Sequence, residues 1–135
     1  MKEEYSKEDI VEHRMNKARE SLLEAKGVAE IGFINSSVNR LYYSCFYAVT
    51  ALLLQENISA KTHAGVRQML GLHFVETEKI SKKLGKLYSD LFESRQDSDY
   101  EDFFIVEIEL LADLTRGADD FIAAIEKLIN TNLAK

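Results

Sequence analysis

No proline interrupts the 135 residues of this chain, and apolar side chains recur along it at the three- and four-residue spacing of an α-helix. Proline breaks helices, whereas sheet proteins use proline and glycine for their turns. The chain also has only 6 glycines. These features predict an all-α protein: an up-and-down bundle of about five helices, formed as a single domain over residues 1–135.

The apolar stripes also predict where the helices lie. Ser6 with Asp9, and Ser98 with Glu101, have the spacing of capping boxes, which predicts that helices begin at these two places. The second helix is apolar on most of its surface, which indicates a central helix or one that a partner chain also covers. The predicted helices span about 6–26, 36–55, 63–74, 80–96 and 99–130.

Composition limits the function. The formal net charge of -6 repels nucleic acid at long range, which argues against indiscriminate RNA or DNA binding but leaves room for a local basic patch. The single Cys45 excludes an internal disulfide framework and a cysteine-rich zinc site. Residues 1–5 lack a signal-peptide apolar core, and the apolar-rich stretch 41–54 is too short to span a bilayer. We therefore expect a cytoplasmic protein without a membrane partner.

Motifs for common cofactors are missing from the sequence. It contains no phosphate-binding glycine loop and no H-E-x-x-H, and none of its three histidines has the E-x-x-H spacing of di-iron bundles. We therefore expect neither a metal nor a cofactor.

The segment from Arg95 to Tyr100, at the predicted junction of the fourth and fifth helices, is the first candidate site. A helix junction can project side chains off the packed surface, where functional sites tend to lie. The alternative is that Arg95 forms an ordinary surface ion pair with Glu93, Asp97 or Asp99.

Three further residues are candidate contacts for an anionic ligand: Arg40, His63 and Arg67. His63 and Arg67 share one helix face near an N-terminus, where an anion is favoured. The alternative is that Thr62 caps this helix and His63 makes one structural hydrogen bond. Arg40 lies on an apolar helix and must be paired or reach water, so we expect a bridge to an acidic residue, with ligand binding as the alternative.

The second helix carries a run of aromatic residues. We expect them to serve as core and interface residues and not as a base-stacking platform, because they lack the surrounding basic residues that such platforms use. The run consists of Tyr42, Tyr43, Phe46 and Tyr47.

Three segments together resemble the HEPN (higher eukaryotes and prokaryotes nucleotide-binding) domain family. The likeness extends over about residues 8–130 and is closest to the small, stand-alone bacterial and archaeal members. The segments are Asn39-Arg40-x-Tyr42-Tyr43, Lys61-Thr62-His63-x-Gly65-Val66 and Leu91-Phe92-x-x-Arg95-Gln96-x-x-Asp99-Tyr100.

The resemblance implies a helical bundle that forms homodimers. Many relatives are encoded beside a minimal nucleotidyltransferase and act with it as a toxin–antitoxin pair. Ribonuclease members carry an R-x(4–6)-H motif whose arginine and histidine cleave RNA without a metal. Arg95 matches the arginine, but Tyr100 stands where the histidine would be, and no histidine follows His73. Tyrosine titrates at about pH 10 and histidine at about pH 6.5, so a tyrosine in place of the motif histidine weakens proton transfer at neutral pH.

The sequence therefore predicts a homodimeric HEPN protein that acts as the partner of a minimal nucleotidyltransferase and binds protein, nucleotide or RNA. One alternative is a metal-independent ribonuclease toxin in which Arg95 binds phosphate and Tyr100 or His63 replaces the missing histidine. A second alternative is a non-catalytic interaction module.

Overall fold

The computed structural model describes residues 4–100 and 108–133, and all regular structure in these ranges is helical. The all-α prediction is confirmed. None of the helices in the described ranges is long and apolar enough to cross a membrane. The elements are α1 (Lys7–Glu30), α2 (Ile34–Gln55), α3 (His63–Leu70), the short π-helix η1 (Gly71–Val75), α4 (Lys82–Tyr100) and α5 (Ile108–Leu133).

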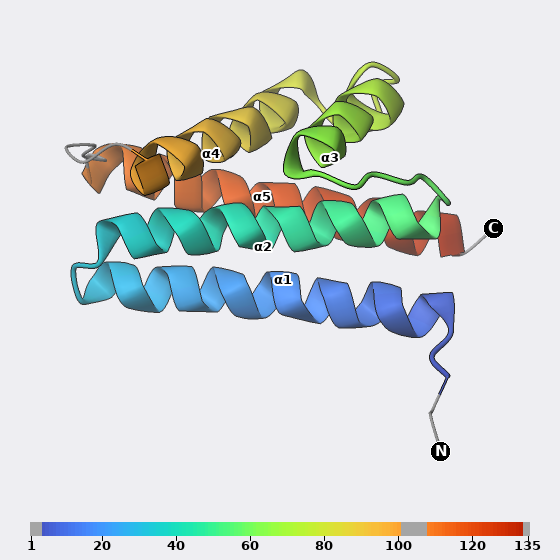
Figure 1. Cartoon of the computed structure of the whole chain (residues 1–135), viewed down its shortest axis with the longest axis horizontal. Coiled ribbons are helices and arrows are strands. Elements are labelled where there is room, and N and C mark those ends of the chain that lie inside the picture. Colours follow the sequence, from blue (N-terminus) through green and yellow to red (C-terminus); the bar gives the residue numbers. More distant parts are fainter. Residues whose placement is uncertain (1–3, 101–107, 134–135) are drawn as a thin grey trace.

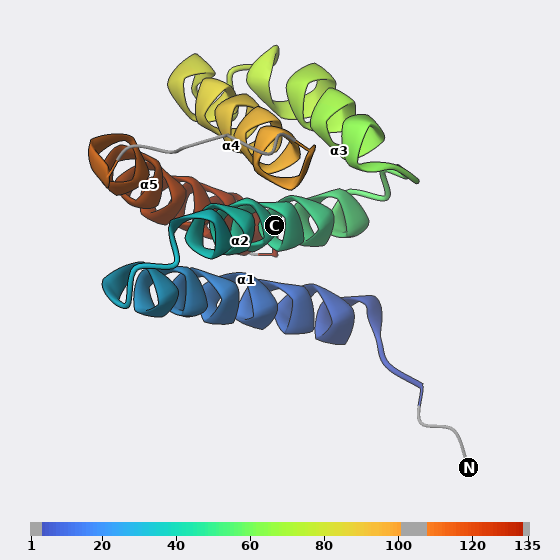
Figure 2. The ribbon, with the colours of Figure 1, turned by 60° about the vertical axis from the view of Figure 1, so that its left-hand side comes forward.

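The helices form three layers with α2 in the middle (Figures 1 and 2). α1 lies along one side of α2, α5 packs beside α2, and α3 and α4 form the layer on the opposite side from α1. This arrangement explains why α2 is apolar on most of its surface: four helices of its own chain pack against it. The prediction of a central helix is confirmed.

Small side chains let α1 and α2 pack closely. The predicted stripe of α1 is buried at Val11, Met15 and Leu22, with Ala18 and Ala25 fully inaccessible to solvent. The buried Ser37 hydroxyl of α2 donates a 2.8 Å hydrogen bond to the carbonyl of Ala25, so a polar group in this seam is satisfied. The chain reverses between the two helices at Gly32, whose φ of +92° is readily adopted only by glycine.

The structure corrects two predicted helix boundaries. α4 continues through Tyr100, so the predicted helix start near Asp99 is wrong, although Ser98 and Glu101 have capping-box spacing. Serine and glutamate are both tolerated inside helices, so this local pattern does not by itself end one. The predicted third helix stops being α-helical at Leu70 and continues as η1. The longer turn of η1 holds Phe74, which is 2% exposed, in the core.

Contacts with α5 fix the position of α4. Tyr88 of α4 stacks on Phe121 of α5 with ring centroids 5.5 Å apart. Gly117 of α5 faces Leu87 of α4 so closely that a β-carbon there would lie 2.5 Å from a Leu87 methyl group. This close approach holds the first half of α4 against α5, and Arg95 lies about two turns further along the same helix.

Candidate functional site

Two neighbouring tyrosines of α2 form the centre of the candidate site. Successive residues of a helix point about 100° apart. Tyr42 therefore faces the core and is fully buried, whereas Tyr43 lies at the edge of the core and is half-buried. Their rings meet edge to face with centroids 5.2 Å apart. Burial raises the pKa of the Tyr42 hydroxyl above its usual value, so this group stays protonated at neutral pH.

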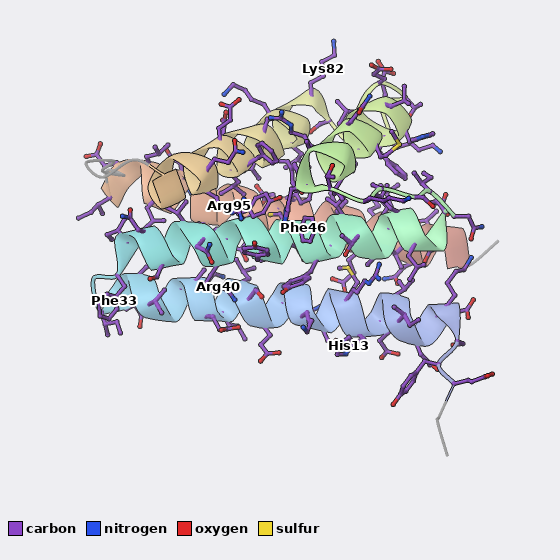
Figure 3. The ribbon with its side chains drawn as sticks, in the orientation of Figure 1. His13, Phe33, Arg40, Phe46, Lys82 and Arg95 are labelled. Carbon is purple, nitrogen blue, oxygen red and sulfur yellow. The ribbon has the colours of Figure 1, made fainter. Side chains whose placement is uncertain are left out.

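Arg95 of α4 reaches both tyrosines. Its Nη2 donates a 3.2 Å hydrogen bond to the Tyr43 hydroxyl. Its guanidinium carbon lies 5.4 Å from the Tyr42 ring centroid and 5.6 Å from that of Tyr43, which is cation–π distance. In Figure 3 Arg95 lies between α4 and α2. The side chain is thus held against the central helix at a fixed place.

His63 begins α3 and contacts the same pair of tyrosines. Its Nδ1 is 2.7 Å from the Tyr42 hydroxyl, and its ring stacks on Phe46 with centroids 4.5 Å apart. Burial, and then the nearby Arg95 cation, lower the pKa of His63 below its usual value, so the imidazole is neutral at pH 7. Thr62 Oγ1 accepts the Gly65 N–H at 2.9 Å, so the predictions of a Thr62 cap and a structural His63 hydrogen bond are confirmed.

Arg40 is also part of this cluster. It lies on α2 with its guanidinium carbon 5.4 Å from the Tyr43 ring centroid, and it donates a 3.0 Å hydrogen bond to Asn39. The expected bridge from Arg40 to an acidic residue is wrong, because no carboxylate pairs with it in the part of the chain that the structure describes.

Arg67 lies at the margin of the cluster. Its guanidinium carbon is 4.1 Å from the Phe92 ring centroid, and its Nη1 is 3.9 Å from a Glu93 carboxylate oxygen. It is therefore partly neutralised and packed on an aromatic ring of α4, which makes it less available to a ligand than Arg40.

The structure thus gathers residues that were separate candidates in the sequence. Arg40, His63 and Arg95 each contact Tyr42, Tyr43 or both. We call these five residues the tyrosine–arginine cluster.

The structure corrects one expectation from the sequence and does not describe the side chain that a second one concerns. The aromatic run does have basic neighbours, so the expectation that it lacks them is wrong. The side chain of Tyr100, the other candidate, lies outside the described part of the structure. Sequence reasoning also missed the contacts of Tyr43; its separation of three residues from Arg40 could have revealed one, but Arg95 is 52 residues away.

Other chemistry has little support among the described residues. Burial raises the pKa of the Cys45 thiol to about 12, so it is not a thiolate nucleophile at neutral pH. No group of three or more histidine, cysteine, aspartate or glutamate residues that could hold a metal ion occurs in residues 4–100 and 108–133.

Comparisons with known proteins agree with this picture. The chain matches the HEPN domain over residues 11–133. It is 43% identical over 123 residues to a UPF0332 protein of Thermotoga maritima, covering 91% of this chain and 93% of that one. It is 31% identical over 126 residues to a protein of Methanocaldococcus jannaschii named "Putative toxin", covering 93% of this chain and 86% of the relative. A second protein of that organism with the same designation is 37% identical over 83 residues, 62% of each chain.

Proposed function

The chain belongs to the HEPN domain family, and from this premise we propose that it is the toxin-like half of a two-protein module whose other half is a minimal nucleotidyltransferase. Two relatives named as toxins support the toxin-like role. The observation that carries the proposal is the tyrosine–arginine cluster, in which two arginines and a neutral imidazole surround one pair of tyrosines.

RNA is the ligand that fits this cluster. Guanidinium groups bind phosphate oxygens in a planar, two-pronged geometry, and they stay charged at all physiological pH values. Arg40 has no carboxylate partner among the described residues, so a phosphate group would not have to displace one. The half-exposed Tyr43 ring beside it offers an aromatic face to a base.

We also propose that the protein works as a homodimer. The covered surface of α2 no longer supports this, because helices of the same chain cover it. Large apolar side chains remain exposed at the end of the bundle where α1 meets α2 and α5 begins: Ile31 is 69% exposed, Phe33 59% and Ile108 75%. Light scattering on the purified protein should give the mass of two chains, and Phe33→Glu should give the mass of one.

A metal-independent ribonuclease is the second candidate, and the position of His63 favours it. When its proton is on Nδ1, the imidazole donates to the Tyr42 oxygen and leaves Nε2 as a base. Nε2 would take the proton of a ribose 2′-hydroxyl, whose oxygen attacks the adjacent phosphorus while the bond to the 5′-oxygen breaks. The 5′-oxygen takes a proton from water, and the products are a 2′,3′-cyclic phosphate and a 5′-hydroxyl. Arg95 would hold the phosphate.

The test uses purified wild type, Arg95→Ala and His63→Gln, incubated with single-stranded RNA in buffer containing a chelator. The matched control is Arg116→Ala, which removes an exposed arginine of α5 paired with Asp113. RNA binding and cleavage are measured, together with co-purification of the proposed minimal nucleotidyltransferase partner.

The outcomes separate the candidates. Binding that Arg95→Ala weakens about tenfold, without cleavage, supports the proposed binding role. Cleavage that both site variants abolish and the control retains supports the ribonuclease. If wild type neither binds RNA nor retains the nucleotidyltransferase, the chain is a non-catalytic interaction module and the proposal is wrong.

A further inference from the structure

A groove with a volume of about 690 Å³ extends along α2, from Phe46 to Leu54, and reaches the tyrosine–arginine cluster at His63, where α3 begins. α1 forms one wall with His13, Arg14 and Lys17, and the segment before α3 forms the other with Lys61 and Thr62. The buried side chains of Leu53 and Val66 lie at its floor. None of the residues that line it is acidic, although the chain as a whole has a net charge of -6.

The cations of this groove differ from a set of basic side chains elsewhere in the described part of the chain that pair with carboxylates. Five basic side chains outside it each pair with a carboxylate within 4.0 Å: Arg19, Lys26, Arg67, Lys86 and Arg116. Arg14, Lys17 and Lys61 have no such partner among the described residues. Instead, Arg14 donates a 3.1 Å hydrogen bond to the Thr50 carbonyl, and the Lys17 ammonium lies 5.3 Å from the Tyr47 ring centroid. Their charges remain available to an anionic ligand.

A second cleft provides a contrast. It lies between α1 and α5, has a volume of about 320 Å³, and is lined by acidic as well as basic side chains, including Glu8, Glu12 and Glu126. The carboxylates of this cleft would offset the attraction of its basic side chains for an anion. The larger groove therefore differs from this cleft in having a lining of cations without carboxylates.

The groove and the cluster share one side chain, that of His63. His63 and Phe46 line the groove, and the same two rings stack on each other while His63 contacts Tyr42. A chain with a phosphate group at Arg95 could therefore continue past His63 between Lys17 and Lys61. A polymer with a negative charge at every unit fits this series of cations better than a single small anion does.

We propose that this groove binds single-stranded RNA next to the segment held by the tyrosine–arginine cluster, with Arg14, Lys17 and Lys61 contacting its phosphates. The inference rests on the proposed function, because it extends the same site. It assigns phosphate-binding roles to Arg14 and Lys17 of α1, which the sequence did not single out, and to Lys61, which the sequence marked only as part of a family segment.

The experiment measures binding of a labelled single-stranded uridine decamer, with its salt dependence, to wild type and to the Lys17→Gln/Lys61→Gln double variant. Both lysines are exposed, so the fold should persist, which circular dichroism checks. The matched control is Lys82→Gln/Lys83→Gln, which changes the net charge equally. Figure 3 shows Lys82 at the start of α4, on the other side of the bundle from His13 of the groove wall.

The groove variant should bind the decamer about tenfold more weakly, because each lost cation–phosphate contact costs roughly a fewfold in affinity after screening by salt. The slope of log affinity against log salt should fall by about 0.7 per lost contact, or about 1.4 in total. The control and the binding of a uridine dinucleotide, which the cluster alone can hold, should change little.

The other outcomes overturn one proposal or both. If the control weakens binding as much as the groove variant does, only net charge matters and the groove inference is wrong. If polyglutamate of equal charge displaces the decamer equally well, the groove accepts acidic peptide and not RNA in particular. If Arg95→Ala abolishes binding while the groove variant binds normally, the proposed function stands and the groove inference fails. If wild type binds no RNA, the groove inference and the proposed RNA-binding role of the cluster both fail, and co-purification of the nucleotidyltransferase alone then decides the rest of the proposed function.

Discussion

Replacing Gly117 by alanine tests the contact that holds α4, and with it Arg95, against the rest of the bundle. Gly117 lies inside α5, where alanine has the better helix propensity by about 1 kcal/mol. Its new methyl group, however, would lie 2.5 Å and 2.9 Å from the two Leu87 methyl carbons and 3.2 Å from Leu87 Cγ. Because these contacts are too short, Leu87 or α4 must move, which typically costs 1–3 kcal/mol, about as much as overpacking costs elsewhere.

Gly27 provides the matched control. It also lies inside a helix, α1, but a β-carbon there would meet no atom within 4 Å. Gly27→Ala should therefore raise the free energy of unfolding by about 0.5–1 kcal/mol, whereas Gly117→Ala should leave it unchanged or lower it by up to about 2 kcal/mol. In a chain of this length 1 kcal/mol corresponds to about 4 °C in Tm, which thermal unfolding followed by circular dichroism resolves.

A double-mutant cycle identifies the cause. Leu87→Ala removes all three carbon atoms that the new methyl group would meet. The Gly117→Ala change should then be favourable in the Leu87→Ala background, with a coupling energy of about 1–3 kcal/mol between the two positions. If Gly117→Ala raises Tm as much as Gly27→Ala does, α4 and α5 do not meet at this point, and the reasoning is refuted.

Two further predictions concern the tyrosine–arginine cluster. Tyr42→Phe removes the 2.7 Å hydrogen bond to His63 and should lower the free energy of unfolding, measured by chemical denaturation, by about 1–2 kcal/mol. The control Tyr47→Phe, at a partly exposed ring, should change it by less than about 0.5 kcal/mol. Equal effects of the two variants would mean that the Tyr42–His63 hydrogen bond contributes nothing to stability. Burial and the Arg95 cation lower the pKa of His63 in the folded protein. As the pH falls below about 6.5, the unfolded chain therefore binds this proton before the folded protein does. The free energy of unfolding should decrease between that pH and the lower pKa of folded His63. His63→Gln should remove this part of the slope, and NMR titration should show a higher His63 pKa in Arg95→Gln than in wild type; an unchanged pKa would mean that the two side chains do not interact.

Local patterns in the sequence were enough to predict the helices. The stripe Val11, Met15, Ala18, Leu22 and Ala25 is buried throughout α1, and the Ser6–Asp9 capping box forms as predicted. These features depend on residues three or four positions apart, whose relative positions the helix itself fixes. The same reasoning failed at Ser98, because serine and glutamate with this spacing also fit inside a continuous helix.

Most of the candidate site residues could also be identified from the sequence, but their arrangement could not. Arg40 was a candidate because it lies on an apolar helix, His63 because it lies near a helix N-terminus, and Arg95 because it was predicted at a helix junction. Their meeting at Tyr42 and Tyr43 depends on separations of 21 residues for His63 and 52 for Arg95. Contacts at such separations follow from how helices stack, which no local pattern contains.

The sequence by itself determined that this protein is helical, that α2 is too apolar to lie on a surface, and which family the chain resembles. Only the tertiary structure decided which cations face one another and which face a carboxylate. An acidic chain can present a groove lined by cations and no carboxylates because net charge is a sum over all residues, whereas binding depends on the few charges that packing brings to one place.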